Sequence, residues 1–312
     1  MIRNITLLLA LMVSFSVFSE TREMDKELRL ASMIDDIQAL ELLLKKGANV
    51  NSANKFGKTA LMFAVENGNL LTVSILLARG ADVNIKTVAN CTALTFAAEN
   101  GEIEISSVLL ERGADLRVRT RAGWNSLMIA SRYGQTAMVE QLLYKNADPN
   151  EADKNGLTAL MMASAQGHAD TADVLLKNGA DVSLNDKDGK TALIHATSTD
   201  KSNTIINLLL KYGSDIEASS TDGATALIWA AGQSNVNAVY QLLSNSANIN
   251  AQDKNGTTAL MEAVTVRSVD TVRELINRGA KLTIKNKRDK SALDLANKYR
   301  NKKIRSMLMS KE

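Results

Sequence analysis

The chain has 312 residues, of which 45% are hydrophobic and only 4% aromatic, and it contains one proline and one cysteine. Its formal net charge of +3 is too small to indicate a polyanionic partner, so nucleic acid is not expected. A single cysteine excludes an internal disulfide, and the fold must therefore be stabilised by the packing of aliphatic side chains.

The first nineteen residues differ from the rest of the chain. A short positive segment with Arg3 precedes an uncharged run rich in Leu, Val and Phe. This run is shorter than the roughly 20 residues that a membrane-spanning helix needs, and Val17 and Ser19 suit a signal-peptidase site. We predict a signal peptide over residues 1–19 and export to the periplasm, with secretion as the second possibility. A retained membrane anchor is the alternative to cleavage.

The glycines reveal an internal repeat. Sixteen of the 17 glycines follow divisions of about 33 residues, and only Gly232 is out of register. One set precedes a triplet similar to Thr-Ala-Leu, a second follows that triplet, and a third closes the unit. A fixed period of this size predicts an array of identical supersecondary units, which is typical of binding proteins.

One unit, over residues 151–183, illustrates the pattern. Residues 153–156 form a turn signal, and Thr158 has the side chain that an N-cap requires. A short helix then ends at Gly167, because a left-handed C-cap favours glycine. A second helix ends at Gly179. Each helix is too short to be stable alone, so neighbouring units must supply the missing contacts.

The triplet recurs eight times in one register, always with an N-capping residue first. The copies are Thr59-Ala60-Leu61, Thr92-Ala93-Leu94, Asn125-Ser126-Leu127, Thr158-Ala159-Leu160, Thr191-Ala192-Leu193, Thr225-Ala226-Leu227, Thr258-Ala259-Leu260 and Ser291-Ala292-Leu293. The closing motif appears as Gly47-Ala48-Asn49-Val50-Asn51 and Gly80-Ala81-Asp82-Val83-Asn84. The spacing is 33 except for one step of 34, whose extra residue lies within residues 197–203.

This pattern resembles the ankyrin repeat over essentially the whole chain after residue 22. The family's Pro is replaced by Ala or Ser126, and its His usually by Met or Ile, so we expect apolar packing to replace the family's Thr–His hydrogen bonding. The resemblance implies an all-α solenoid of helix-turn-helix units with projecting loops. We predict an array over residues 20–312, with an N-terminal capping unit (20–51), seven full repeats (52–283) and a C-terminal capping unit (284–312).

The residues that could carry chemistry are few. His168 follows Gly167, where the family commonly has His for structural reasons, and His195 occupies a first-helix position that is otherwise mostly apolar. Cys91 has no neighbour that would activate its thiol. We interpret all three as structural, and we predict no enzyme activity, no metal and no cofactor, because no catalytic or ligand spacing is visible.

The resemblance also implies where a partner binds. Partners of ankyrin arrays usually contact the loop tips and the exposed side of the first helices, on a concave face. Carried over to this chain, the rule predicts a protein-binding patch of Phe56, Val88, Arg121, Trp124, Arg132, Tyr133 and Leu157. We expect Phe56, Val88, Trp124 and Leu157 to align on adjacent loops, with Trp, Tyr and Arg as hot-spot residues. The alternative is that Trp124 packs on its neighbours.

Charge is unevenly distributed along the chain. Residues 281–312 carry a net charge of +8, whereas residues 20–280 carry −6. A basic end could contact anionic lipid headgroups, but solvation of a terminal cap is the interpretation that we favour. We predict a monomeric, exported bacterial scaffold or adaptor that binds an envelope protein. The alternative is a secreted effector that binds a host protein; an accessory factor for a haem or peroxide enzyme, or an enzyme, is less favoured.

Overall fold

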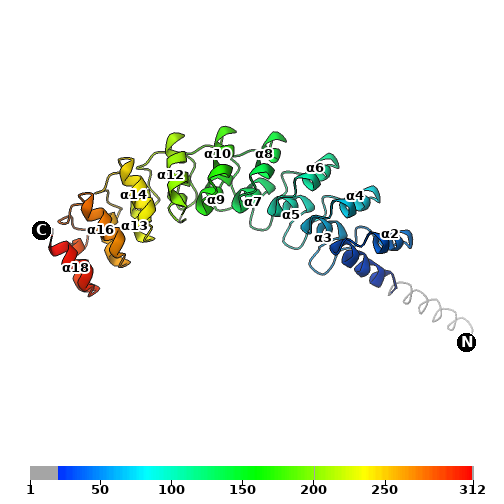
Figure 1. The fold of residues 1–312 in the computed structure, drawn as a ribbon, viewed down its shortest axis with the longest axis horizontal. Helices are drawn as coiled ribbons and strands as arrows, with labels where there is room; N and C mark the ends of the chain where they lie inside the picture. The colour runs from blue at the N-terminus through cyan, green and yellow to red at the C-terminus, as the bar shows by residue number, and fades with distance from the viewer. Residues whose placement is uncertain (1–19, 200, 311–312) are drawn as a thin grey trace, which may run out of the picture. The chain divides into compact units, whose positions relative to one another are not determined.

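The computed structural model describes residues 20–199 and 201–310, so the predicted signal peptide and Lys311 lie outside the described residues. These residues are arranged as pairs of short helices (Figure 1). A helical segment over residues 20–33 is followed by α2 (Ile37–Lys45). The later pairs are α3 (Ala60–Glu66) and α4 (Leu70–Ala78), α5 (Ala93–Asn100) and α6 (Ile103–Glu111), α7 (Ser126–Tyr133) and α8 (Thr136–Tyr144), α9 (Ala159–Gln166) and α10 (Ala169–Lys177), α11 (Ala192–Ala196) and α12 (Ser202–Lys211), α13 (Ala226–Gly232) and α14 (Val236–Ser244), α15 (Ala259–Thr265) and α16 (Val269–Asn277), and α17 (Ala292–Lys298) and α18 (Lys302–Met309).

The array divides into two compact units, the first ending at Ala130 and the second beginning at Ser131. Within each unit the first helices of the pairs form one layer and the second helices form another (Figure 1). The loops between pairs project beside the first helices. We call the surface formed by the first helices and these loops the loop-side face, and we describe it separately for each unit.

The core of each unit lies between the two layers. The Leu of the triplet is buried in most repeats, as at Leu61 and Leu160, and so are the small side chains that follow it, such as Ala64 and Ala163. The second helices contribute Val and Leu, for example Leu76. Small residues let adjacent helices approach closely, and Leu fills the space between them. Packing between repeats thus stabilises helices that are individually too short to form.

The predicted helix ends are confirmed in the unit over residues 151–183. The backbone N–H of Met161 donates to Thr158 Oγ1 over 3.3 Å, which satisfies one of the free amides at the start of α9. Gly167 ends α9 in the left-handed conformation, with φ of 73°. Local capping chemistry therefore sets both ends of this helix.

Adjacent repeats are joined by backbone hydrogen bonds between their loops. The amide of Val88 donates to Phe56 O over 2.9 Å, and the amide of Arg121 donates to Ala89 O over 2.8 Å. The second unit has the same contact, where the amide of Lys187 donates to Asn155 O over 2.8 Å. Each loop is thus held by its neighbour, which makes the row of loops a continuous surface within each unit.

Asparagine side chains bridge the closing motifs of successive repeats. Asn84 Nδ2 donates to Gly113 O over 3.0 Å, and Asn84 Oδ1 accepts from the amide of Asp115 over 3.0 Å. Asn150 makes the equivalent pair of bonds to Gly179 and Asp181. The same position is Ser183 in the following repeat, and its hydroxyl donates to Asp181 Oδ1 within its own turn over 2.6 Å. The repeat after Ser183 also has a buried hydroxyl, that of Ser214, without a hydrogen-bond partner among the described residues.

The 34-residue step changes the connection between α11 and α12. Helix α11 ends at Ala196 with Thr197 as its C-cap, and α12 begins at Ser202. Asn235 of the next repeat donates through Nδ2 to the carbonyls of Thr197 and Thr199, each over 2.8 Å. The side chain of a neighbouring repeat thus holds the start of this connection, at Thr197 and Thr199.

Candidate protein-binding face

In the first unit, three of the predicted residues lie at loop tips. Phe56 is 61% exposed and Val88 is 57% exposed, and the backbones of these two residues are hydrogen bonded to each other. Arg121 is exposed on the next loop, where its Nη2 donates to Val88 O over 3.1 Å. These residues form a contiguous row with apolar side chains and one cation directed at solvent.

Trp124 does not align with that row, so the predicted alignment was wrong. Trp124 is half-buried and follows the tip of its loop, with its backbone amide donating to Thr120 Oγ1 over 3.2 Å. It stands at the repeat position of Lys58 and Cys91, two residues beyond that of Phe56. The loop tip is defined by its turn hydrogen bonds, and Trp124 lies on the arm that returns to the first helix.

In the second unit, Leu157 also lies on a returning arm and is half-buried. Its backbone amide donates to Asp153 Oδ1 over 2.9 Å. Tyr133, at the end of α7, is 49% exposed, and Arg132 is exposed beside it. Arg132 and Tyr133 therefore present accessible side chains, whereas the side chain of Leu157 is only partly accessible.

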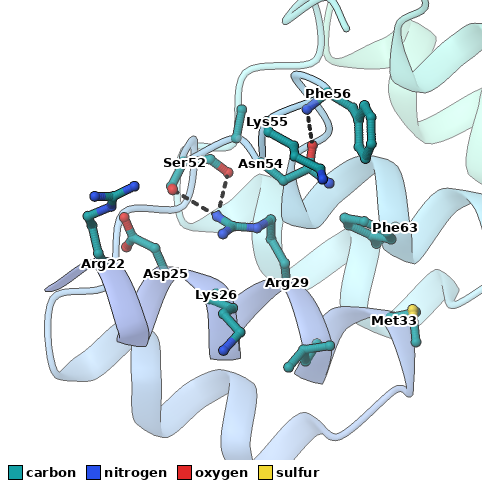
Figure 2. Close-up of a pocket in the computed structure, with 12 residues that line it drawn as sticks. Arg22, Asp25, Lys26, Arg29, Met33, Ser52, Asn54, Lys55, Phe56 and Phe63 are labelled. Atoms are coloured by element: carbon teal, nitrogen blue, oxygen red, sulfur yellow. Dashed lines mark hydrogen bonds between the residues drawn. The ribbon is translucent and has the colours of Figure 1, made fainter. Parts of the chain in front are cut away.

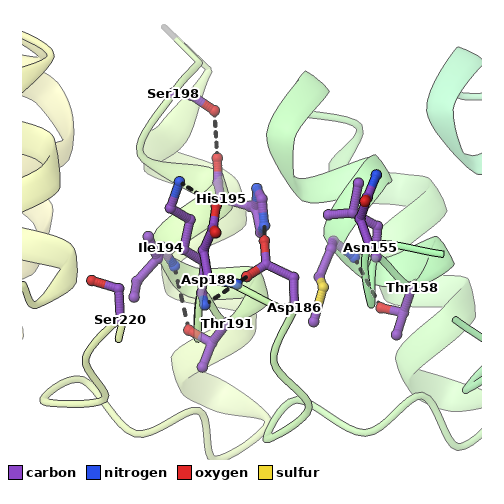
Figure 3. A network of polar contacts seen from close by, with 12 residues as sticks. Asn155, Thr158, Asp186, Asp188, Thr191, Ile194, His195, Ser198 and Ser220 are labelled. Carbon is purple, nitrogen blue, oxygen red and sulfur yellow. Dashed lines mark hydrogen bonds and ion pairs between the residues drawn. The ribbon is translucent and has the colours of Figure 1, made fainter. Parts of the chain in front are cut away.

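Both histidines make structural contacts in the second unit. His195 Nε2 lies 2.8 Å from Asp186 Oδ2 (Figure 3), while Asp186 Oδ1 accepts from the amides of Asp188 and Lys190, each over 2.9 Å. His195 thus connects α11 to the turn that precedes it. His168 Nε2 lies 3.1 Å from Arg132 O. Each ring therefore fixes a loop or a helix end.

The backbone around Cys91 forms part of its loop. The Cys91 amide donates to Thr87 Oγ1 over 3.0 Å, and the Cys91 carbonyl accepts from the amide of Thr87 over 2.9 Å. The side chain is half-buried and the thiol is free. This arrangement provides a small residue on the returning arm of the loop.

An acidic hollow lies on the loop-side face of the second unit. Glu262 occupies a first-helix position that is mostly apolar elsewhere, and the hollow, of about 270 Å³, is lined by Glu262, Trp229, Asp222 and Asp253 among others. Burial raises the pKa of Glu262, and the nearby carboxylates of Asp253 and Asp222 raise it further. A Cβ at Gly232 would lie 3.7 Å from Glu262 Oε2, which is an ordinary van der Waals contact, so this side chain does not require glycine there.

A larger groove, which the sequence did not reveal, lies in the first unit. It has a volume of about 600 Å³ and lies between the helical segment over residues 20–33 and the turn over residues 52–56 (Figure 2). Arg29 reaches across it, with Nη1 donating to Ser52 Oγ over 2.9 Å. Phe56 was predicted as a loop-tip residue, but the helix that faces it across the groove was predicted only as part of the N-terminal capping unit.

Within residues 20–310 other than residue 200, no helix is long and apolar enough to cross a membrane. The same residues contain no group of three or more His, Cys, Asp or Glu side chains placed to hold a metal ion.

The family model for ankyrin repeats, described as three copies of the repeat, matches residues 28–120, 127–220, 200–286 and 227–312. These matches cover most of the chain, so the protein belongs to the ankyrin-repeat family. Arrays of this family are scaffolds for protein–protein interaction and are generally not enzymes. No curated protein sequence matches the chain.

Proposed function

We propose that this ankyrin array is an exported bacterial scaffold that binds an envelope protein through its loop-side face. The observation that carries the proposal is the row formed by Phe56, Val88 and Arg121 in the first unit. Two large apolar side chains are held at solvent-exposed tips, although burial would stabilise them. Because the tips are hydrogen bonded to one another, a partner would bind a surface that is already ordered and would lose little conformational entropy there.

Export is proposed from the sequence of residues 1–19. Their positive start, uncharged apolar run and small terminal residue are typical of a signal peptide. Expression of the full chain in a Gram-negative host should yield a periplasmic protein whose mass corresponds to a chain starting at Glu20. A protein of full-length mass in the membrane fraction would instead support the retained anchor.

Site-specific photo-crosslinking tests the binding face. A photoreactive residue replaces Phe56 in one variant and Leu71 in a second. Leu71 is a matched control because it is 59% exposed, close to the 61% of Phe56, and belongs to the second-helix layer of the same unit. We expect one dominant adduct from position 56 and none from position 71. Equal adducts at both positions would contradict binding through the loop-side face.

A further inference from the structure

The groove of the first unit combines an apolar floor with a cationic rim. One stripe of the segment over residues 20–33 supplies Arg22, Lys26, Arg29 and Met33, because residues three or four apart share a helix face. The opposing turn supplies Lys55 and Phe56, and Phe63 lies beside them (Figure 2). Leu30 completes the apolar lining.

The apolar side chains in this groove are unusually accessible. Leu30 is 49% exposed, Met33 is 41% exposed, and Phe56 is more exposed than either. They come from two repeats that face the same space, so their exposure is not scattered over the surface. A cluster of this kind is stabilised when an apolar side chain of a partner covers it.

The charges of the groove are unbalanced. Four cations line it against one carboxylate, that of Asp25, and Asp25 Oδ1 already accepts from the amide of Asn49 over 2.7 Å. Lys26 is paired with Glu23 over 2.7 Å. Arg22 and Lys55 are exposed, and neither forms an ion pair among the described residues. The imbalance is local, because residues 20–280 as a whole are net negative.

We infer that this groove binds an acidic segment of a partner protein, with a bulky apolar side chain of that segment against Phe56 and Met33. This inference deepens the proposed function and rests on it. The carboxylates of the segment would approach Arg22 and Lys55, while Arg29 stays bonded to Ser52 and keeps the two walls together. An acidic segment without an apolar side chain would leave Phe56 and Met33 uncovered. An apolar segment without carboxylates would leave Arg22 and Lys55 without ionic partners.

Peptide binding to a chain that starts at Glu20 tests the inference. The probe is a fluorescein-labelled peptide that is rich in Asp and Glu and contains one Phe and one Leu. Its binding is measured by fluorescence anisotropy at low salt. Two matched peptides replace Phe and Leu by Ser, or every acidic residue by Lys. We expect the first peptide to bind, its affinity to fall with added salt, and both matched peptides to bind at least tenfold more weakly.

Variants of the groove complete the test. R22E/K55E should weaken binding of the acidic peptide at least tenfold, and F56S should weaken it several-fold. K45E/K86E makes the same change of charge at exposed lysines of the same unit outside the groove, and should bind like the wild type. Circular dichroism checks that every variant is folded. Binding that survives R22E/K55E, or equal binding of the Ser peptide, would overturn the inference.

The remaining outcomes distinguish an acidic protein segment from a lipid surface and from a protein partner that binds at Phe56 without an acidic segment. Vesicles of phosphatidylglycerol that bind the wild type but not R22E/K55E, together with no peptide binding, would overturn the inference in favour of a lipid surface. If no acidic peptide binds but the probe at position 56 still gives one dominant protein adduct, the inference fails while the proposed function stands. If both measurements fail, the proposed function fails with it.

Discussion

Asn84 contacts the next repeat through both ends of its side-chain amide, which donates to Gly113 and accepts from Asp115. A neutral hydrogen bond at an accessible site contributes about 0.5–1.5 kcal/mol. We therefore expect N84A to lower the free energy of opening between these repeats by about 1 kcal/mol. Native-state hydrogen exchange over residues 80–116 measures this free energy directly.

Ser183 provides the control for that prediction. It occupies the same repeat position, but its hydroxyl bonds within its own turn. S183A should change the opening free energy of its neighbourhood by less than about 0.5 kcal/mol, as most exposed substitutions do. Equal losses in N84A and S183A would contradict a bridging role for the asparagine.

Glu262 affects stability through its charge. Its folded-state pKa is raised above the ordinary value of 4.5, mainly by burial and then by Asp253 and Asp222. The unfolded state therefore loses this proton more readily, so the ionised carboxylate destabilises the fold at neutral pH. The penalty disappears as the pH falls through the raised pKa and Glu262 becomes protonated.

The substitution E262Q should therefore raise the midpoint of denaturation at pH 7, and its advantage over the wild type should shrink towards pH 4. E104Q is the control, because Glu104 is exposed on α6 and should respond little at either pH. Denaturant titrations at both pH values measure the effect. An advantage for E262Q that grows as the pH falls would contradict the predicted sign.

Two glycines that follow helices differ in what a larger side chain would meet. Gly134, between α7 and α8, has φ of 69°, and a Cβ there would lie 2.6 Å from His168 Nδ1. Gly179 follows α10 and has φ of 86°, and a Cβ there would meet nothing within 4 Å. Strain of the left-handed backbone is common to both positions, but the steric clash occurs only at Gly134.

We therefore expect G134A to be the more destabilising of the two substitutions. G179A should cost about 1 kcal/mol, the usual penalty for a non-glycine residue in this conformation. G134A should cost about 1–3 kcal/mol more, because an overpacked contact adds to the strain. Urea denaturation compares them. The double variant G134A/H168A removes the clash and should recover part of the loss.

At the scale of single helices and loops, the helices could be predicted because the residues that mark their ends act locally. Thr158 and Gly167 bound a helix whatever surrounds them, since capping depends on one side chain or one φ angle. The loop tips were less predictable, because a shift of two residues moved Trp124 from the tip to the returning arm. That placement depends on which amide and carbonyl close the turn, and residue type does not specify them.

At the scale of the whole molecule, the period of the sequence predicts the architecture, and the family model confirms it. The groove of the first unit could not be predicted in this way. It depends on how the stripe containing Arg29 faces the turn containing Phe56, and this is a tertiary contact between segments with different sequence signals. The repeat pattern thus specifies the scaffold, whereas departures from the pattern specify what the scaffold binds.

The position of Ser183 has a mechanical consequence. Repeat arrays under tension yield at the interface that holds least well, because each repeat contacts only its neighbours. Within the second unit, Asn150 and Asn250 each bridge the interface between their own repeat and the next one. Ser183 has the same repeat position but bonds within its own turn, so its interface lacks this bridge. When the chain is stretched in an optical trap, the interface after Ser183 should therefore open at the lowest force in that unit. S183N should raise the force of that one step, so a single side chain would select the place at which the second unit opens first.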